Sequence, residues 1–132
     1  MRFLLDTDTC IYALKAHINV LSKLLSMNRE DVAISVMTEA ELRTGAAKSS
    51  SPAKTLRRVE NFFRPLSIIE LTSQDAIAYA RVRAHLERAG TPIGPLDTII
   101  AAQAVARDLT LVSNNEREFR RVARLRIENW TG

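Results

Sequence analysis

The chain has few of the residues that build disulfides or soft-metal sites. Its 132 residues include one cysteine, Cys10, and two histidines, His17 and His85. A single cysteine excludes an internal disulfide and a thiolate metal cluster, and without Cys/His clusters zinc is not expected. Cys10 is typical of a small buried core residue, because neither histidine has an evident place beside it as a base. A metal bound by this chain would therefore take oxygen ligands.

Glycine, proline and long apolar runs are also scarce. The four glycines are scattered, and none forms a phosphate-binding loop. No apolar run approaches the roughly 20 residues of a membrane span. Residues 1–5 are too short for a signal peptide, so we expect a cytoplasmic protein. With 46% apolar residues, the chain can bury a core, and we expect a single domain over residues 1–132.

Positive charge is in modest excess and unevenly placed. There are 19 lysines and arginines against 15 acids, and the isoelectric point is near 9.7. This balance is compatible with binding a polyanion. The cations gather in the middle and at the end of the chain, at Lys48, Lys54, Arg57, Arg58 and Arg64 and at Arg117, Arg120, Arg121, Arg124 and Arg126. Basic flanks around acidic segments suit an enzyme that binds phosphate groups.

Strand-like and helix-like segments are predicted to alternate. Strands are expected at 2–6, 31–35, 67–71, 109–113 and 126–128. Helices are expected from a cap at 7–9, at about 18–27, from Ser35 or Thr38 to Ala47, at 52–64, from Thr72 or Ser73 to Gly90, and at 96–107. In the helix that ends at Gly90, the residues expected to face inward are Ala76, Ala80, Val82 and Leu86. No hairpin signal is present. The pattern predicts an α/β fold with a mainly parallel sheet.

Acidic residues stand where the apolar segments end. They are Asp6 after the first strand, Glu39 and Glu41 in the helix after the second, Asp97 in the first turn of the most apolar helix, and Glu116 and Glu118 beyond the fourth strand. Sites in parallel sheets form at the carboxyl ends of strands, so these acids are expected to gather at one edge. A divalent cation would relieve their mutual repulsion, and oxygen ligands favour Mg²⁺ or Mn²⁺.

Each acid also has a structural alternative. Asp6 can cap the following helix, and Asp97 can complement a helix dipole. The glutamates can be solvated or paired with nearby arginines. Glu39 and Glu41 lie about 200° apart on a helix, so only one can face a common centre. The sequence favours Glu41, because Glu39 follows Thr38 at a possible capping position.

Four segments, at 4–8, 34–45, 94–102 and 112–119, together resemble the PIN-domain toxins of VapBC toxin–antitoxin systems. The resemblance covers essentially the whole chain, including its ending at 125–130. It implies a three-layer α/β/α sandwich and a metal-dependent endoribonuclease, with tRNA as the expected substrate. It also implies the toxin role in a type II system, inhibition by a cognate VapB antitoxin, and a homodimer.

The resemblance assigns the family's functional residues to positions of this chain. The metal ligands fall on Asp6, Glu41 and Asp97. The fourth acidic position is open, because many members carry an aspartate where this chain has Asn115, and Glu118, one turn later, is the substitute we expect. Thr7, Ser113 and Asn115 are expected to support the site. Asp8, at a position usually held by asparagine, either adds charge or caps the helix.

These assignments give a mechanistic hypothesis with alternatives. A metal-activated water would hydrolyse the RNA, and Arg43, Lys48 and Arg117 would contact its backbone. An antitoxin would dock between the early helices and place an arginine in the carboxylate ring. One alternative is a catalytically inactive PIN domain that works as an RNA-binding or interaction module. Another is a metal-dependent phosphatase or DNA nuclease.

Overall fold

Five short strands form one parallel sheet at the centre of the molecule. The computed structural model describes residues 1–132. The strands are β1 (Phe3–Leu5), β2 (Val32–Ser35), β3 (Ser67–Ile69), β4 (Thr110–Val112) and β5 (Arg126–Glu128). Their order is β3-β2-β1-β4-β5, and every neighbouring pair is parallel. The predicted parallel sheet is confirmed, and four strands are shorter than predicted because their flanking residues cap helices or enter loops.

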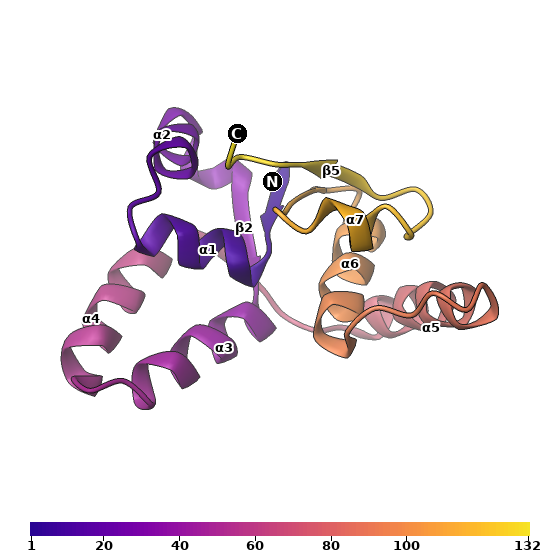
Figure 1. Ribbon diagram of the computed structural model, residues 1–132, viewed down its shortest axis with the longest axis horizontal. Helices are drawn as coiled ribbons and strands as arrows, with labels where there is room; N and C mark the ends of the chain where they lie inside the picture. Colours follow the sequence, from indigo (N-terminus) through magenta and orange to yellow (C-terminus); the bar gives the residue numbers. More distant parts are fainter.

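Helices cover both faces of the sheet, which Figure 1 shows between two helical groups. One face carries α1 (Thr7–Leu14), α2 (Ile18–Ser26), α3 (Val36–Ala47) and α4 (Pro52–Phe63), and the other carries α5 (Ser73–Arg88), α6 (Pro95–Arg107) and α7 (Glu116–Phe119). A 3₁₀ turn, η1 (Arg29–Asp31), precedes β2. None of these helices combines the length and apolar character that a membrane crossing requires.

Alternation along the strands divides the core into two parts. Phe3 and Leu5 of β1 pack with the first helical group, whereas Leu4 packs with the second. All three side chains are at most 3% exposed. Because successive strand residues point to opposite faces, one apolar run serves both cores. The three-layer α/β/α sandwich is thereby confirmed.

Capping residues fix where the helices begin. Asp6 caps α1 by accepting a 2.8 Å hydrogen bond from the Thr9 amide, so the expectation that residues 7–9 supply the cap is wrong. Ser35 caps α3 through the Met37 amide at 3.0 Å. Pro52 and Pro95 open α4 and α6, where a missing amide proton costs nothing.

The inward face of α5 differs from the prediction. Ala76 and Ala80 are exposed, whereas Leu86 is buried and Val82 packs partly buried against the core, as expected, and Asp75 is 3% exposed. Asp75 forms a capping box with Thr72 and a two-pronged ion pair with Arg107 of α6, in which Arg107 Nη2 lies 3.0 Å from Asp75 Oδ2. This buried pair turns the helix so that the aspartate, rather than the alanines, faces α6.

Candidate active site

Three strands end together at one edge of the sheet. Leu5 lies opposite Ile34 on one side and Val112 on the other. The next residues along the three strands are therefore neighbours: Asp6, Ser35 at the end of β2, and Ser113. The Asp6 amide donates to the Val112 carbonyl at 3.0 Å, which continues the pairing by one step. The topology thus gathers the carboxyl ends of β1, β2 and β4, as the sequence predicted.

Asp6 is buried at this edge with only 3% of the residue exposed. Burial raises the pKa of Asp6, hydrogen bonds from Ser113 and Thr9 lower it, and the charge of Asp8 raises it, so that the pKa of Asp6 stays above its ordinary value. The Thr9 hydroxyl also donates to the Val112 carbonyl at 3.0 Å, which ties α1 to β4. Asp6 therefore caps a helix and also faces a negatively charged environment.

Asp97 lies in the first turn of α6, where the helix dipole favours an anion. The pKa of Asp97 is nevertheless raised to about 6, first by burial and then by the charges of Asp6, Glu118 and Asp8. Burial and the repulsion from these three acids together outweigh the dipole. None of the four carboxylates forms a salt bridge with a lysine or arginine. The chain therefore assembles a negative cluster that it does not neutralise.

Glu118 on α7 is held in this cluster by its own loop. Asn115 Nδ2 donates to Glu118 Oε2 at 2.8 Å, and the Asn115 amide donates to Ser113 Oγ at the same distance. Ser113 in turn lowers the pKa of Asp6. Thus Ser113 and Asn115, both predicted as supporting residues, link the carboxylates of Asp6 and Glu118.

Glu41 lies apart from the other acids. It is exposed on α3, and its charge is not among those that raise the pKa of Asp97. Glu39 is engaged by Arg43, with Oε2 at 2.8 Å from Nε, so of the two glutamates only Glu41 is unpaired. The hydroxyls of Thr7 and Thr38 lie 3.1 Å apart and join the starts of α1 and α3. The assignment of Glu41 to the metal site stays a prediction.

The donor set fits a hard divalent cation. No three acidic, histidine or cysteine side chains stand close enough together to enclose a metal ion by themselves. The cluster of Asp6, Asp97 and Glu118 nevertheless offers only oxygen ligands, and its charge is not matched by any cationic side chain. Mg²⁺ usually keeps several waters and binds through one or two carboxylates. The residues present thus suit an ion whose remaining ligands are water or substrate.

The basic residues assigned to RNA binding differ in whether an acidic side chain already pairs with them. Arg43 pairs with Glu39 and, at 3.3 Å, with Glu60, and its guanidinium lies over the Phe63 ring. Its charge is therefore already matched. Lys48 and Arg117 are exposed and form no salt bridge. No acidic side chain of the chain therefore pairs with these two residues, in contrast to Arg43.

A groove of about 320 Å³ runs from this edge between α1, α3 and α4. Thr7 and Glu41 line it, and its floor is apolar. It also contains two basic side chains. The lining residues are Thr7, Ile11, Leu14, Lys15, Glu41, Leu42, Gly45, Ala46, Thr55, Arg58 and Val59.

Sequence reasoning missed Thr9 and Thr38 as parts of the site. Thr9 is 2% exposed and Thr38 is fully buried. Thr9 had a signal in the sequence, because it lies three residues after Asp6 and the amide at that position donates to a capping aspartate. Thr38 had none beyond being polar on a helix, since its contact with Thr7 spans 31 positions.

Comparisons with known proteins agree with this geometry. The family model of the PIN domain matches residues 3–125. The tRNA(fMet)-specific endonuclease VapC of Salmonella typhimurium is 41% identical over 130 residues, which is 98% of each chain. Ribonuclease VapC2 of Haemophilus influenzae is 38% identical over 131 residues, again 98% of each chain.

Solved structures show the same likeness. The DNA-bound VapBC of Salmonella typhimurium contains a chain that superposes with a TM-score of 0.93 at 41% identity, covering 98% of both chains. The promoter-bound VapBC2 of Rickettsia felis gives a TM-score of 0.92 at 34% identity, covering 98% of this chain and 99% of that one. On the family match, the identities and the superpositions, the chain belongs to the PIN domain family and groups with its VapC ribonucleases.

Proposed function

We propose that this protein is the toxin of a type II toxin–antitoxin system and acts as a metal-dependent endoribonuclease that cleaves tRNA. The observation that supports this most is the negative cluster of Asp6, Asp97 and Glu118 at the carboxyl edge of the sheet, which no basic side chain neutralises. The relatives named ribonuclease and tRNA(fMet)-specific endonuclease support the reaction and the substrate class.

The metal in this proposal is Mg²⁺, with Mn²⁺ as an alternative. Asp6, Asp97 and Glu118 would hold it partly through water molecules, and Glu41 would contribute through a water molecule across the groove. When bound, such an ion lowers the pKa of a coordinated water and stabilises the charge that develops on a phosphate. Without it, the same carboxylates repel the RNA backbone, so the chain by itself opposes substrate binding at this edge.

The other residues of the site hold the carboxylates in place and bind the substrate. Thr9 and Ser113 orient Asp6 by hydrogen bonds, and Asn115 orients Glu118. Lys48 and Arg117 would bind phosphates on either side of the scissile bond, which makes RNA binding depend on salt. Hydrolysis by water would leave a 3′-hydroxyl and a 5′-phosphate.

The partner in this proposal is a VapB-type antitoxin. Relatives of known structure are VapBC complexes. The apolar groove between α1, α3 and α4 suits an antitoxin segment, because it leads from the surface to Glu41 and Thr7. An arginine from that segment would be attracted to the unmatched carboxylates and would occupy the place of the metal. The expected homodimer remains a prediction, tested by light scattering.

The test is cleavage of a tRNA pool by the purified protein with Mg²⁺ and with EDTA. We expect cleavage only with Mg²⁺, and Asp97→Asn should abolish it while leaving RNA binding intact. Asp108→Asn is the matched control, because Asp108 ends the same helix, lies far from the cluster and has a left-handed φ of 55° that asparagine tolerates.

Other results would contradict the proposal. Equal cleavage by Asp97→Asn and the wild type would show that the cluster is not the active site. RNA binding without any cleavage in Mg²⁺ or Mn²⁺ would favour the alternative of an inactive RNA-binding module. Faster cleavage of DNA or phosphate monoesters would indicate a different hydrolase.

A further inference from the structure

The C-terminal segment after β5 makes side-chain contacts with the loop after β4 and with the start of α7, the helix that carries Glu118. Strands β4 and β5 are paired in parallel, and the Ser113 amide still donates to the Glu128 carbonyl at 2.9 Å. Beyond that point the two chains separate, one entering α7 and the other becoming the tail. This tail lies outside the residues that the PIN domain model matches, which end at 125.

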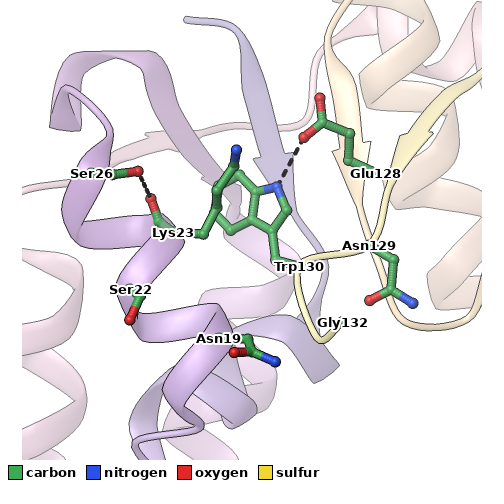
Figure 2. Close-up of a pocket in the computed structure, with 8 residues that line it drawn as sticks. All are labelled: Asn19, Ser22, Lys23, Ser26, Glu128, Asn129, Trp130 and Gly132. Carbon is green, nitrogen blue, oxygen red and sulfur yellow. Dashed lines mark hydrogen bonds between the residues drawn. The ribbon is translucent and has the colours of Figure 1, made fainter.

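Trp130 anchors the tail. It is 5% exposed, its ring lies edge-on to Phe3 with centroids 5.5 Å apart, and its Nε1 donates to Glu128 Oε1 at 3.0 Å. Figure 2 shows the indole between α2 and Glu128, with the Asn129 side chain pointing away from it. A buried aromatic anchor gives the residues beside it fixed positions.

Asn129 and Thr131, on either side of the anchor, bind the loop after β4. Asn129 Nδ2 lies 3.1 Å from Asn114 Oδ1 and 3.2 Å from Glu116 Oε2. The Thr131 hydroxyl lies 2.6 Å from Asn129 Oδ1 and 3.1 Å from Asn114 Oδ1. We call the group formed by Asn114, Asn129 and Thr131 the tail clasp. Asn114 also donates to the Tyr12 hydroxyl at 3.2 Å, so the clasp reaches α1.

The tail clasp contacts only one of the two glutamates of α7. Glu116 is held by Asn129 and lies 3.8 Å from Arg120, outside the charges that act on Asp97. Glu118 is left to Asn115 and to the carboxylate cluster. Holding Glu116 and Asn114 at the start of α7 therefore sets the direction in which Glu118 projects.

We infer that Asn129 and Thr131 are positioning residues, which fix the loop after β4 so that Glu118 faces Asp6 and Asp97. This inference rests on the proposed function, because it gives the clasp a role only if Glu118 helps to hold the metal. Neither residue touches the reacting atoms. Their effect is transmitted through Asn114, Glu116 and the backbone of α7.

The test measures Mn²⁺ binding by calorimetry and amide hydrogen exchange of residues 113–119. Asn129→Ala should weaken Mn²⁺ binding about threefold to tenfold. This is somewhat less than the usual loss for a residue that hydrogen bonds directly to a metal-binding side chain. Exchange in 113–119 should become faster, while the melting temperature shifts by less than about 2 °C, as for most surface substitutions. RNA cleavage should lose kcat with little change in KM.

Three comparisons separate positioning from general loosening. Asn61→Ala truncates an exposed side chain of α4 that forms no hydrogen bond, and it should leave Mn²⁺ binding unchanged. Thr131→Val should behave like Asn129→Ala, whereas Thr131→Ser should bind Mn²⁺ normally because it keeps the hydroxyl. In a Glu118→Gln background, Asn129→Ala should have no further effect on Mn²⁺ binding.

The inference is overturned if Asn129→Ala binds Mn²⁺ like the wild type, or if its loss is equally large without Glu118. If the wild type cleaves RNA and the Asn129→Ala variant binds Mn²⁺ and cleaves RNA equally well, this inference fails and the proposed function stays in place. A wild-type protein that neither binds Mn²⁺ nor cleaves RNA would overturn both.

Discussion

Replacing Asp97 by asparagine should make the metal-free protein more stable at neutral pH. The pKa of Asp97 rises from an ordinary 3.8 to about 6, which corresponds to about 3 kcal/mol against the charged form. Asp97 is only half-buried, and solvent screening reduces this figure. Its favourable interaction with the α6 dipole, about 0.5 kcal/mol, is also lost in the variant. We therefore expect a net gain of about 1–2 kcal/mol.

The gain should depend on pH in a definite direction. Because the folded pKa of Asp97 lies above the unfolded one, the folded protein binds the extra proton between pH 4 and 6. The wild type is therefore destabilised above about pH 6, and this destabilisation disappears as the pH falls through that range. Asp97→Asn should be more stable at pH 7.5, while the two proteins should converge near pH 4.

The assay is thermal unfolding in EDTA at several pH values. A gain of about 1–2 kcal/mol corresponds to roughly 3–8 °C in a chain of this length. Adding Mg²⁺ at pH 7.5 should stabilise the wild type and not Asp97→Asn, since only the wild type holds the ion in its folded state. Asp108→Asn should melt close to the wild type throughout, because it loses only an exposed ion pair with Arg126. A variant that is less stable than the wild type at pH 7.5 in EDTA would refute the argument that burial and repulsion disfavour the charge on Asp97.

Three further outcomes follow from other contacts. Arg107→Met should destabilise the fold by about 3 kcal/mol, because it leaves Asp75 buried without its partner. Urea unfolding measures this change, and a loss of stability under about 1 kcal/mol would contradict the prediction. Burial raises the pKa of Asp75, but the hydrogen bonds from Arg107 and Thr72 and the charge of Arg107 together outweigh it and lower the pKa, so the wild type should lose this stability as the pH falls below about 4, measured as a falling urea midpoint. Glu41→Gln should reduce RNA cleavage at least tenfold while Glu39→Gln leaves it within about twofold, because Glu39 is bound to Arg43; the reverse order would move the assignment to Glu39.

Much of the fold was readable because strands and helices alternate along the chain. Short apolar or β-branched runs predicted the first four strands, and a short fifth was predicted at 126–128. Pro52 marked a helix start correctly, whereas Pro95 opens a helix that was expected to begin at 96. The sheet order was not readable, since strand pairing depends on contacts between distant segments. The inward face of α5 was predicted wrongly for Ala76 and Ala80, because their helical spacing alone was consistent with an inward position. The ion-pair partner that fixes Asp75 inward, Arg107, lies 32 residues further along the chain.

The candidate site was readable where an acid ends an apolar run. Asp6 and Asp97 were predicted this way, and the structure brings both into one cluster with Glu118. Sequence spacing alone could not say which glutamate of α7 faces the cluster, because that choice depends on Asn115 and on the tail at Asn129. The same limit applies to Glu41, whose place depends on how α3 packs beside α1.

Direct titration of the wild type with Mg²⁺ or Mn²⁺ tests the central claim, that these carboxylates form a divalent cation site. Calorimetry at pH 7.5 should show saturable binding to the wild type, and binding at least about 100-fold weaker to the Asp6→Asn, Asp97→Asn double variant. The double variant must remain folded by circular dichroism. Equal binding by both proteins, or none by the wild type at millimolar metal, would contradict the account.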